Sequence, residues 1–345
     1  MAKMKRVTRS EHCPVCGKAD WCRVSGDKRY AVCNRISSKQ DAKGDGGGWI
    51  HWLADAARLP SLKVSVTVNE ESPVADITTR HATYSRLLQL CPLSRGHIAN
   101  LERRGIAEAE RRQRGYGTLS SDARPSLCDA LQPEYQLQGV PGFCIQNDMW
   151  TIAGWPGLLL PVRDYEKRIQ AMQVRRDGNC ASRYAWLSSA GRPAGCSSGA
   201  PVHHAYPANA ITDAQVWLTE GPLKADIACE HLGCVVLAIP GIASWRAGLE
   251  VAKRFKRRAD MLVIALDSDA RTNPAVKHVR DALIIEALEQ GWVPRVALWP
   301  PEFKGLDDML VAKTDWSVIN PFRDQLNELG LKTYDAEVDD GEVIR

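Results

Sequence analysis

The sequence lacks any apolar run long enough to cross a lipid bilayer as a helix. Its first ten residues also lack the hydrophobic stretch that a secretory signal requires. Nowhere does the chain contain the G-x-x-x-x-G-K-[ST] loop, which excludes a helicase motor built on that loop. These absences predict a cytoplasmic protein that does not enter a membrane and does not carry its own motor.

The chain has little excess charge of either sign. Its 45 Lys and Arg residues face 41 Asp and Glu residues, which leaves a net charge of +4. A nucleic-acid surface would therefore have to come from local clustering of cations. With 345 residues, 44% hydrophobic and 25% charged, the chain has the composition of a folded protein and room for two or three domains.

Four of the 11 cysteines lie within the first 33 residues, and such a cluster in a cytoplasmic chain indicates a metal site. We expect residues 1–58 to form a zinc ribbon. Cys13 and Cys16 share a tight turn, and Cys33 ends the hairpin that follows. A closed zinc site takes four ligands. The sequence leaves the fourth open between Cys22 and His51, which lies in a later apolar strand that could fold back over the ribbon.

A polar segment, 59–78, reads as a linker to a basic region, 79–210. This region starts with helices, one of them capped by Ser94. Two strands follow, with the sequences G-L-L-L-P-V-R-D and I-Q-A-M-Q-V-R-R-D. In them Arg163, Gln173 and Arg175 alternate with apolar residues, which predicts a polar sheet face on which a polyanion could lie.

Residues 211–315 alternate apolar strands with helices, and acids follow the strands. Glu220 ends the first strand, and Asp267 and Asp269 follow a later one. Carboxylates gathered at one edge of a parallel sheet repel one another unless a hard cation lies between them. A third element, K-G-L-D-D, contributes further charged residues, namely Lys304, Asp307 and Asp308. Residues 316–345 form an acidic C-terminal tail.

The order E-G-P-L-K-A-D, D-S-D and K-G-L-D-D resembles the Toprim domain of bacterial-type primases, topoisomerases and some nucleases. The last element resembles the K-G-x-D-D ending of primase-like Toprim proteins of phages and mobile elements. The cysteine ribbon and the two basic strands resemble the zinc-binding domain and the basic polymerase subdomain of the same primases. One departure is that the usual fourth zinc ligand would fall at Ile36, which cannot coordinate a metal.

The resemblance implies an α/β protein: a mainly parallel, Rossmann-like Toprim core, an α+β basic subdomain and a zinc-ribbon β module. It implies synthesis of short RNA primers on single-stranded DNA from nucleoside triphosphates. Structural Zn²⁺ and catalytic Mg²⁺ or Mn²⁺ would serve as cofactors. A helicase or a helper subunit would then act in trans.

The resemblance also implies roles for individual residues. Glu220 matches the general acid/base or metal ligand, and Asp267 and Asp269 match the pair that holds the catalytic metal. Metal or phosphate contacts are implied for Lys304, Asp307 and Asp308. Contacts to template or nucleotide phosphates would come from Arg163, Arg175, Arg183 and Lys224.

Two other functions fit part of the pattern. A Toprim nuclease would use the same metal site with water as the nucleophile, but it has no obvious need for the ribbon and the basic subdomain. A non-catalytic nucleic-acid-binding replication module would not require Glu220, Asp267 and Asp269 to be intact.

Overall fold

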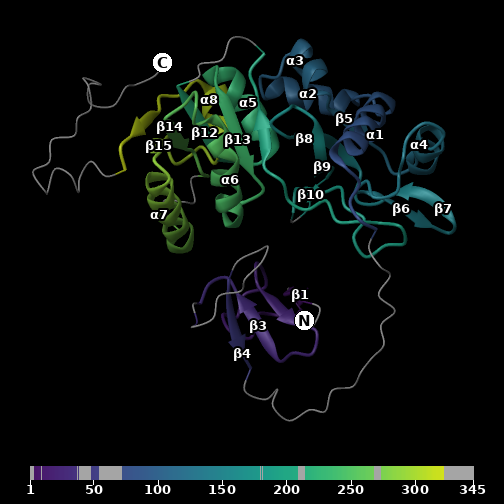
Figure 1. Ribbon diagram of the computed structural model, residues 1–345, viewed down its shortest axis with the longest axis horizontal. Helices are drawn as coiled ribbons and strands as arrows, with labels where there is room; N and C mark the ends of the chain where they lie inside the picture. Colours follow the sequence, from purple (N-terminus) through teal and green to yellow (C-terminus); the bar gives the residue numbers. More distant parts are fainter. Residues whose placement is uncertain are drawn as a thin grey trace, which may run out of the picture. The chain divides into compact units, whose positions relative to one another are not determined.

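The computed structural model describes residues 4–8, 10–36, 38, 48–53, 72–178, 180, 182–208, 214–267 and 273–321. It divides into two compact units, Met1–Thr67 and Val68–Arg345 (Figure 1). Among the described residues, no helix combines the length and the apolar character needed to cross a membrane.

The first unit is a four-stranded antiparallel sheet in the order β1-β2-β3-β4. Its strands are β1 (Met4–Arg6), β2 (Arg23–Ser25), β3 (Tyr30–Cys33) and β4 (Trp49–Trp52). The predicted hairpin is β2–β3, and the apolar strand around His51 does fold back, because β4 pairs with β3. The buried core of this sheet is small and consists of Val7 with three of the cysteines.

The second unit begins with helices followed by a mainly antiparallel region. Its helices are α1 (Ile77–Leu90), α2 (Arg95–Arg103), α3 (Glu108–Arg114) and α4 (Arg124–Leu131). Its strands are β5 (Gly117–Leu119), β6 (Phe143–Gln146), β7 (Met149–Ile152), β8 (Gly157–Arg163), β9 (Ile169–Arg176) and β10 (Tyr184–Trp186). Ser94 caps α2 as predicted, since its hydroxyl accepts the amide hydrogen of His97.

The β8–β9 pair is the centre of a sheet in the order β10-β9-β8-β5. Leu159, Met172 and Val174 lie in one apolar core with α1 and α4, whereas Leu158 and Leu160 lie in another core with residues of α5. The sheet is therefore covered on both faces over most of its length, and Gln173 is buried rather than part of an open polar face.

A six-stranded sheet forms the rest of the unit, in the order β11-β13-β12-β14-β15-β16. Its strands are β11 (His203–Ala205), β12 (Gln215–Glu220), β13 (Val235–Ile239), β14 (Met261–Ile264), β15 (Val293–Leu298) and β16 (Ser317–Ile319). The four central strands are parallel and the two edge strands are antiparallel. The predicted mainly parallel sheet is confirmed.

Helices cover both faces of this sheet (Figure 1). They are α5 (Pro222–Leu232), α6 (Trp245–Ala252), α7 (Pro274–Glu289) and α8 (Leu306–Ala312), with short 3₁₀ turns η2 (Ile242–Ser244) and η3 (Lys253–Phe255). Successive side chains of β12 point to opposite faces of the sheet and contact different helices. Val216 and Leu218 pack with α6 and α7, while Trp217 packs with α5 and α8.

The structure describes only parts of the predicted linker and of the predicted C-terminal tail. The expected tail starts at 316, yet Ser317–Ile319 forms β16 and pairs with β15, so the sheet extends slightly further than predicted. Residues 322–345 of that tail and 59–71 of the predicted linker lie outside the described residues.

Candidate active site and metal centre

The ribbon brings four thiols together. The sulfur atoms of Cys13, Cys16, Cys22 and Cys33 all lie within 4.8 Å of one another. Sγ of Cys22 is 3.7 Å from Sγ of Cys16 and 3.8 Å from Sγ of Cys33. Zn–S bonds of about 2.3 Å in a tetrahedron place the sulfur atoms ~3.8 Å apart. The four thiols therefore fit a structural zinc ion.

Cys22 completes this group, and His51 does not join it. Nε2 of His51 instead lies 2.9 Å from the carbonyl oxygen of Ile36. Ile36 itself contributes through its backbone, because its amide donates to Sγ of Cys33 at 3.3 Å, as does the amide of Arg35 at 3.4 Å. Such hydrogen bonds stabilise a metal-bound thiolate.

The acids of the second unit meet at the carboxyl ends of the parallel strands. Glu220 is the last residue of β12, and Asp267 follows β14 by three residues. Gly221, with φ of +84°, turns the chain sharply from β12 into α5, a conformation that favours glycine. This turn places Lys224, in the first turn of α5, beside the acids. Lys224 forms an ion pair with Asp267.

Asp307 reaches the same place from the start of α8, where its side chain is only 3% exposed. Its Oδ2 accepts a hydrogen bond of 2.9 Å from Nη1 of Arg104, which follows α2. Burial and the neighbouring Asp308 raise the pKa of Asp307, although Lys224 and Arg104 oppose the shift. Burial disfavours the charge of Lys224, but Asp267, Asp307 and Glu220 together outweigh it and raise the pKa of its ammonium group.

The arrangement gathers Glu220, Asp267 and Asp307 around one lysine. The hard carboxylate oxygens of Glu220 and Asp267 suit Mg²⁺ or Mn²⁺, whereas Asp307 is already paired with Arg104. Asp308 and Lys304 are exposed at the rim of this edge. Asp269 lies outside the described residues.

The three arginines expected to contact phosphate lie in different environments. Arg163 donates to the backbone carbonyls of Arg114 and Lys167, each at 2.9 Å, so its guanidinium group supports the fold. Burial lowers the pKa of Arg163. Arg175 lies on β9 opposite Tyr184, and Arg183 is exposed just before β10. Arg183 is therefore the most exposed of the three.

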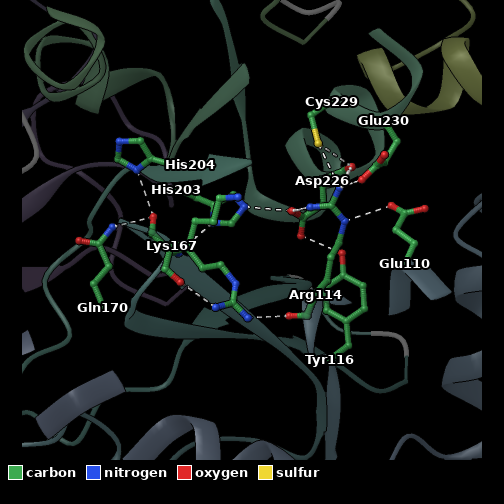
Figure 2. Close-up of polar contacts among 11 residues, drawn as sticks. Glu110, Arg114, Tyr116, Lys167, Gln170, His203, His204, Asp226, Cys229 and Glu230 are labelled. Carbon is green, nitrogen blue, oxygen red and sulfur yellow. Dashed lines mark hydrogen bonds and ion pairs between the residues drawn. The ribbon is translucent and has the colours of Figure 1, made fainter. Parts of the chain in front are cut away.

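A buried ionic cluster that was not predicted from the sequence is centred on Arg114. Figure 2 shows this arginine of α3 between the carboxylates of three residues. It forms ion pairs with Asp226 at 2.5 Å, Glu230 at 2.8 Å and Glu110 at 3.0 Å. Asp226 also accepts hydrogen bonds from Tyr116 at 2.7 Å and lies 3.1 Å from Nε2 of His203.

This cluster joins α3 of the basic region to α5 of the parallel-sheet region. Burial alone would raise the pKa of Asp226, but Arg114 and His203 outweigh it and lower the pKa to about 2. One signal was available in the sequence: Asp226 interrupts the otherwise apolar run A-D-I-A-C of a buried helix, where a carboxylate requires a partner.

A family model described as a domain of unknown function (DUF3854) matches residues 209–316, which span the parallel-sheet region. No curated protein matches the chain.

Three solved structures share the fold. The zinc-binding and RNA polymerase domains of the Aquifex aeolicus primase match with a TM-score of 0.52 and 14% identity, covering 95% of this chain and 85% of that one. A DNA primase domain from Pseudomonas aeruginosa matches with a TM-score of 0.50 and 16% identity, covering 72% of this chain and 78% of that one.

The RNA polymerase domain of Mycobacterium tuberculosis primase DnaG, in complex with a double-stranded DNA oligomer with a 6-nucleotide overhang, matches with a TM-score of 0.50 and 15% identity. That match covers 72% of this chain and 83% of the other. At these identities the likeness defines the fold, which is that of the DnaG-type primase core with a four-cysteine ribbon.

Proposed function

We propose that the protein is a DNA primase that synthesises short RNA primers on single-stranded DNA by metal-dependent nucleotidyl transfer. The observation that carries this proposal is the convergence of Glu220, Asp267 and Asp307 at one edge of a primase-type fold. The K-G-x-D-D element further supports a role in the replication of a phage or another mobile element. The primase would act in the cytoplasm and take a helicase or helper subunit in trans.

The catalytic Mg²⁺ or Mn²⁺ would be held by Glu220, Asp267 and Asp269. When bound, it would polarise the α-phosphate, activate the primer 3′-hydroxyl and neutralise the pyrophosphate leaving group. Glu220, at the strand end, would act either as one of these ligands or as the general base that accepts the hydroxyl proton. Lys304 and Asp308, exposed at the rim, would contact the triphosphate or a second cation, and Arg175 and Arg183 would hold the template.

The test is a primer-synthesis assay on the full chain with single-stranded DNA, Mg²⁺ or Mn²⁺ and labelled ribonucleotides. Oligoribonucleotides should appear with the wild-type protein and vanish with Asp267→Ala. Asp260→Ala is the matched control, because Asp260 is exposed and directly precedes β14, at the opposite end of the strand that Asp267 follows. This control should retain synthesis.

Two other outcomes would replace the proposal. Shortened DNA without nucleotide incorporation, lost in Asp267→Ala, would identify a nuclease. DNA binding without either reaction would identify a non-catalytic replication module.

A further inference from the structure

Lys224 pairs with a carboxylate that a divalent cation would need, that of Asp267. Its ammonium group forms an ion pair with Asp267, one of the proposed metal ligands. The negative charges of Asp307 and Glu220 also stabilise its positive charge. A fixed lysine here would compete with Mg²⁺ for the same carboxylate. If the metal binds Asp267 as proposed, the ammonium group needs a second place.

Asp307 offers that place. Its side chain is 3% exposed, and Arg104 occupies Oδ2 at 2.9 Å. Within the part of the chain that the structure describes, no hydrogen-bond donor reaches its other oxygen, Oδ1, although this atom is buried. A buried carboxylate oxygen without a donor costs free energy, so a donor that arrives there is stabilised.

Gly305, which has no side chain, leaves space for the ammonium group of Lys224 to move from Asp267 to Asp307. A Cβ atom on Gly305 would lie 2.6 Å from Oδ1 of Asp307 and 3.1 Å from Nζ of Lys224, so both groups border the same small space. The backbone of Gly305, at φ −124° and ψ 162°, is accessible to any residue. A side chain at position 305 would therefore fill the space between Lys224 and Asp307 without straining the backbone.

From these contacts we infer that Lys224 is a movable counter-cation: it pairs with Asp267 in the metal-free protein and transfers to Oδ1 of Asp307 once Asp267 binds a divalent cation. This inference rests on the proposed metal site and names Lys224 and Asp307 as positioning residues for it. The lysine stays charged throughout, and its move removes a competing positive charge from Asp267 while satisfying Asp307.

The experiment measures Mn²⁺ binding to the full chain by electron paramagnetic resonance, without DNA or nucleotide. Lys224→Met, which keeps most of the unbranched side chain but removes the ammonium group, should bind Mn²⁺ about tenfold more tightly, equivalent to about 1.4 kcal/mol. Gly305→Ala and Asp307→Asn should bind it several-fold more weakly, because the lysine then stays on Asp267. Lys253→Met is the control, since Lys253 is exposed on η3 and pairs with Glu250; its affinity should not change.

Double variants separate this idea from direct coordination. In the Lys224→Met background, Gly305→Ala and Asp307→Asn should have no further effect. An equal loss of affinity with and without Lys224 would make Asp307 a metal ligand in its own right and overturn the inference. Unchanged or weaker Mn²⁺ binding by Lys224→Met would overturn it as well. Gly305→Ala keeps the test decisive if Asp307→Asn fails to fold through loss of its pair with Arg104.

The outcome is independent of primer synthesis. Tighter binding by Lys224→Met in a protein that makes no primers would support the counter-cation and refute the primase. Primer synthesis that depends on Asp267, without any gain in Mn²⁺ affinity in Lys224→Met, would support the primase and refute the counter-cation.

Discussion

We expect Arg114 to contribute more than any other described residue to the stability of the contact between α3 and α5. Its side chain is 8% exposed and contacts carboxylates of Asp226, Glu110 and Glu230, all within 3.0 Å. Arg114→Met retains much of the aliphatic stem but removes the cation. Three acids would then face one another in a buried space, with His203 and Tyr116 as the remaining partners of Asp226.

The size of the effect follows from this burial. Removing one partner of a buried, hydrogen-bonded charge network costs about 3–5 kcal/mol, because the remaining charges are left uncompensated. For a folded unit of this size, each 1 kcal/mol lowers Tm by roughly 2 °C. Arg114→Met should therefore lower the Tm of the core by about 6–10 °C.

Differential scanning calorimetry on the full chain measures this shift. Arg112→Met is the matched control on the same helix, since Arg112 forms an ion pair with Glu108 in which both side chains are at least 67% exposed. An exposed pair contributes only about 0.3–0.5 kcal/mol, so this variant should melt within about 1 °C of the wild type. Arg114→Met combined with Asp226→Asn should recover part of the loss. Equal, small shifts for Arg114→Met and Arg112→Met would refute the reasoning.

Three further predictions concern metal content, acid stability and template binding. Cys22→Ser should lower the zinc content from about one ion per chain and loosen the ribbon, whereas His51→Ala should retain the ion; metal analysis that shows the opposite pattern would refute the four-cysteine site. Asp226 stabilises the fold above the pKa it has when unfolded, near 3.8, and this contribution should fade as the pH drops from there toward about 2. Urea titrations at pH 5, 4 and 3 should accordingly show a shallower loss of stability in Asp226→Asn than in the wild type. Arg183→Glu should weaken single-stranded DNA binding and reduce its salt dependence, by about 0.7 in the logarithmic slope for each lost phosphate contact, while an unchanged slope would exclude this residue from the template site.

The sequence was sufficient to predict the elements whose residues repeat with the period of a strand and the site whose residues require a metal. The parallel sheet follows from apolar runs alternating with helices, and Glu220 and Asp267 stand where those strands end. The ribbon follows from clustered cysteines in a segment with almost no apolar core. Choosing Cys22 over His51 required coordinates, because both lie close to the ribbon strands in sequence and only a three-dimensional arrangement separates them.

Counter-charges could not be assigned in the same way. Arg104 and Arg114 come from a segment that suits phosphate binding and a solvated surface equally well, yet they pair with Asp307 and Asp226, 203 and 112 residues away. Pairings over such distances depend on how the two halves of the core pack. A local charge count carries no information about them.

The same pairings bear on how the core could hold a template. Arg104, Arg111, Arg114 and Arg163 are all engaged inside the protein, with carboxylates or backbone carbonyls. The composition of the basic region therefore overstates the charge that it offers to a polyanion. Under the proposed function, the contacts to single-stranded DNA would come from exposed cations such as Arg183 and from the ribbon. With few free cations in the described part of the basic region, such binding should show only a modest salt dependence.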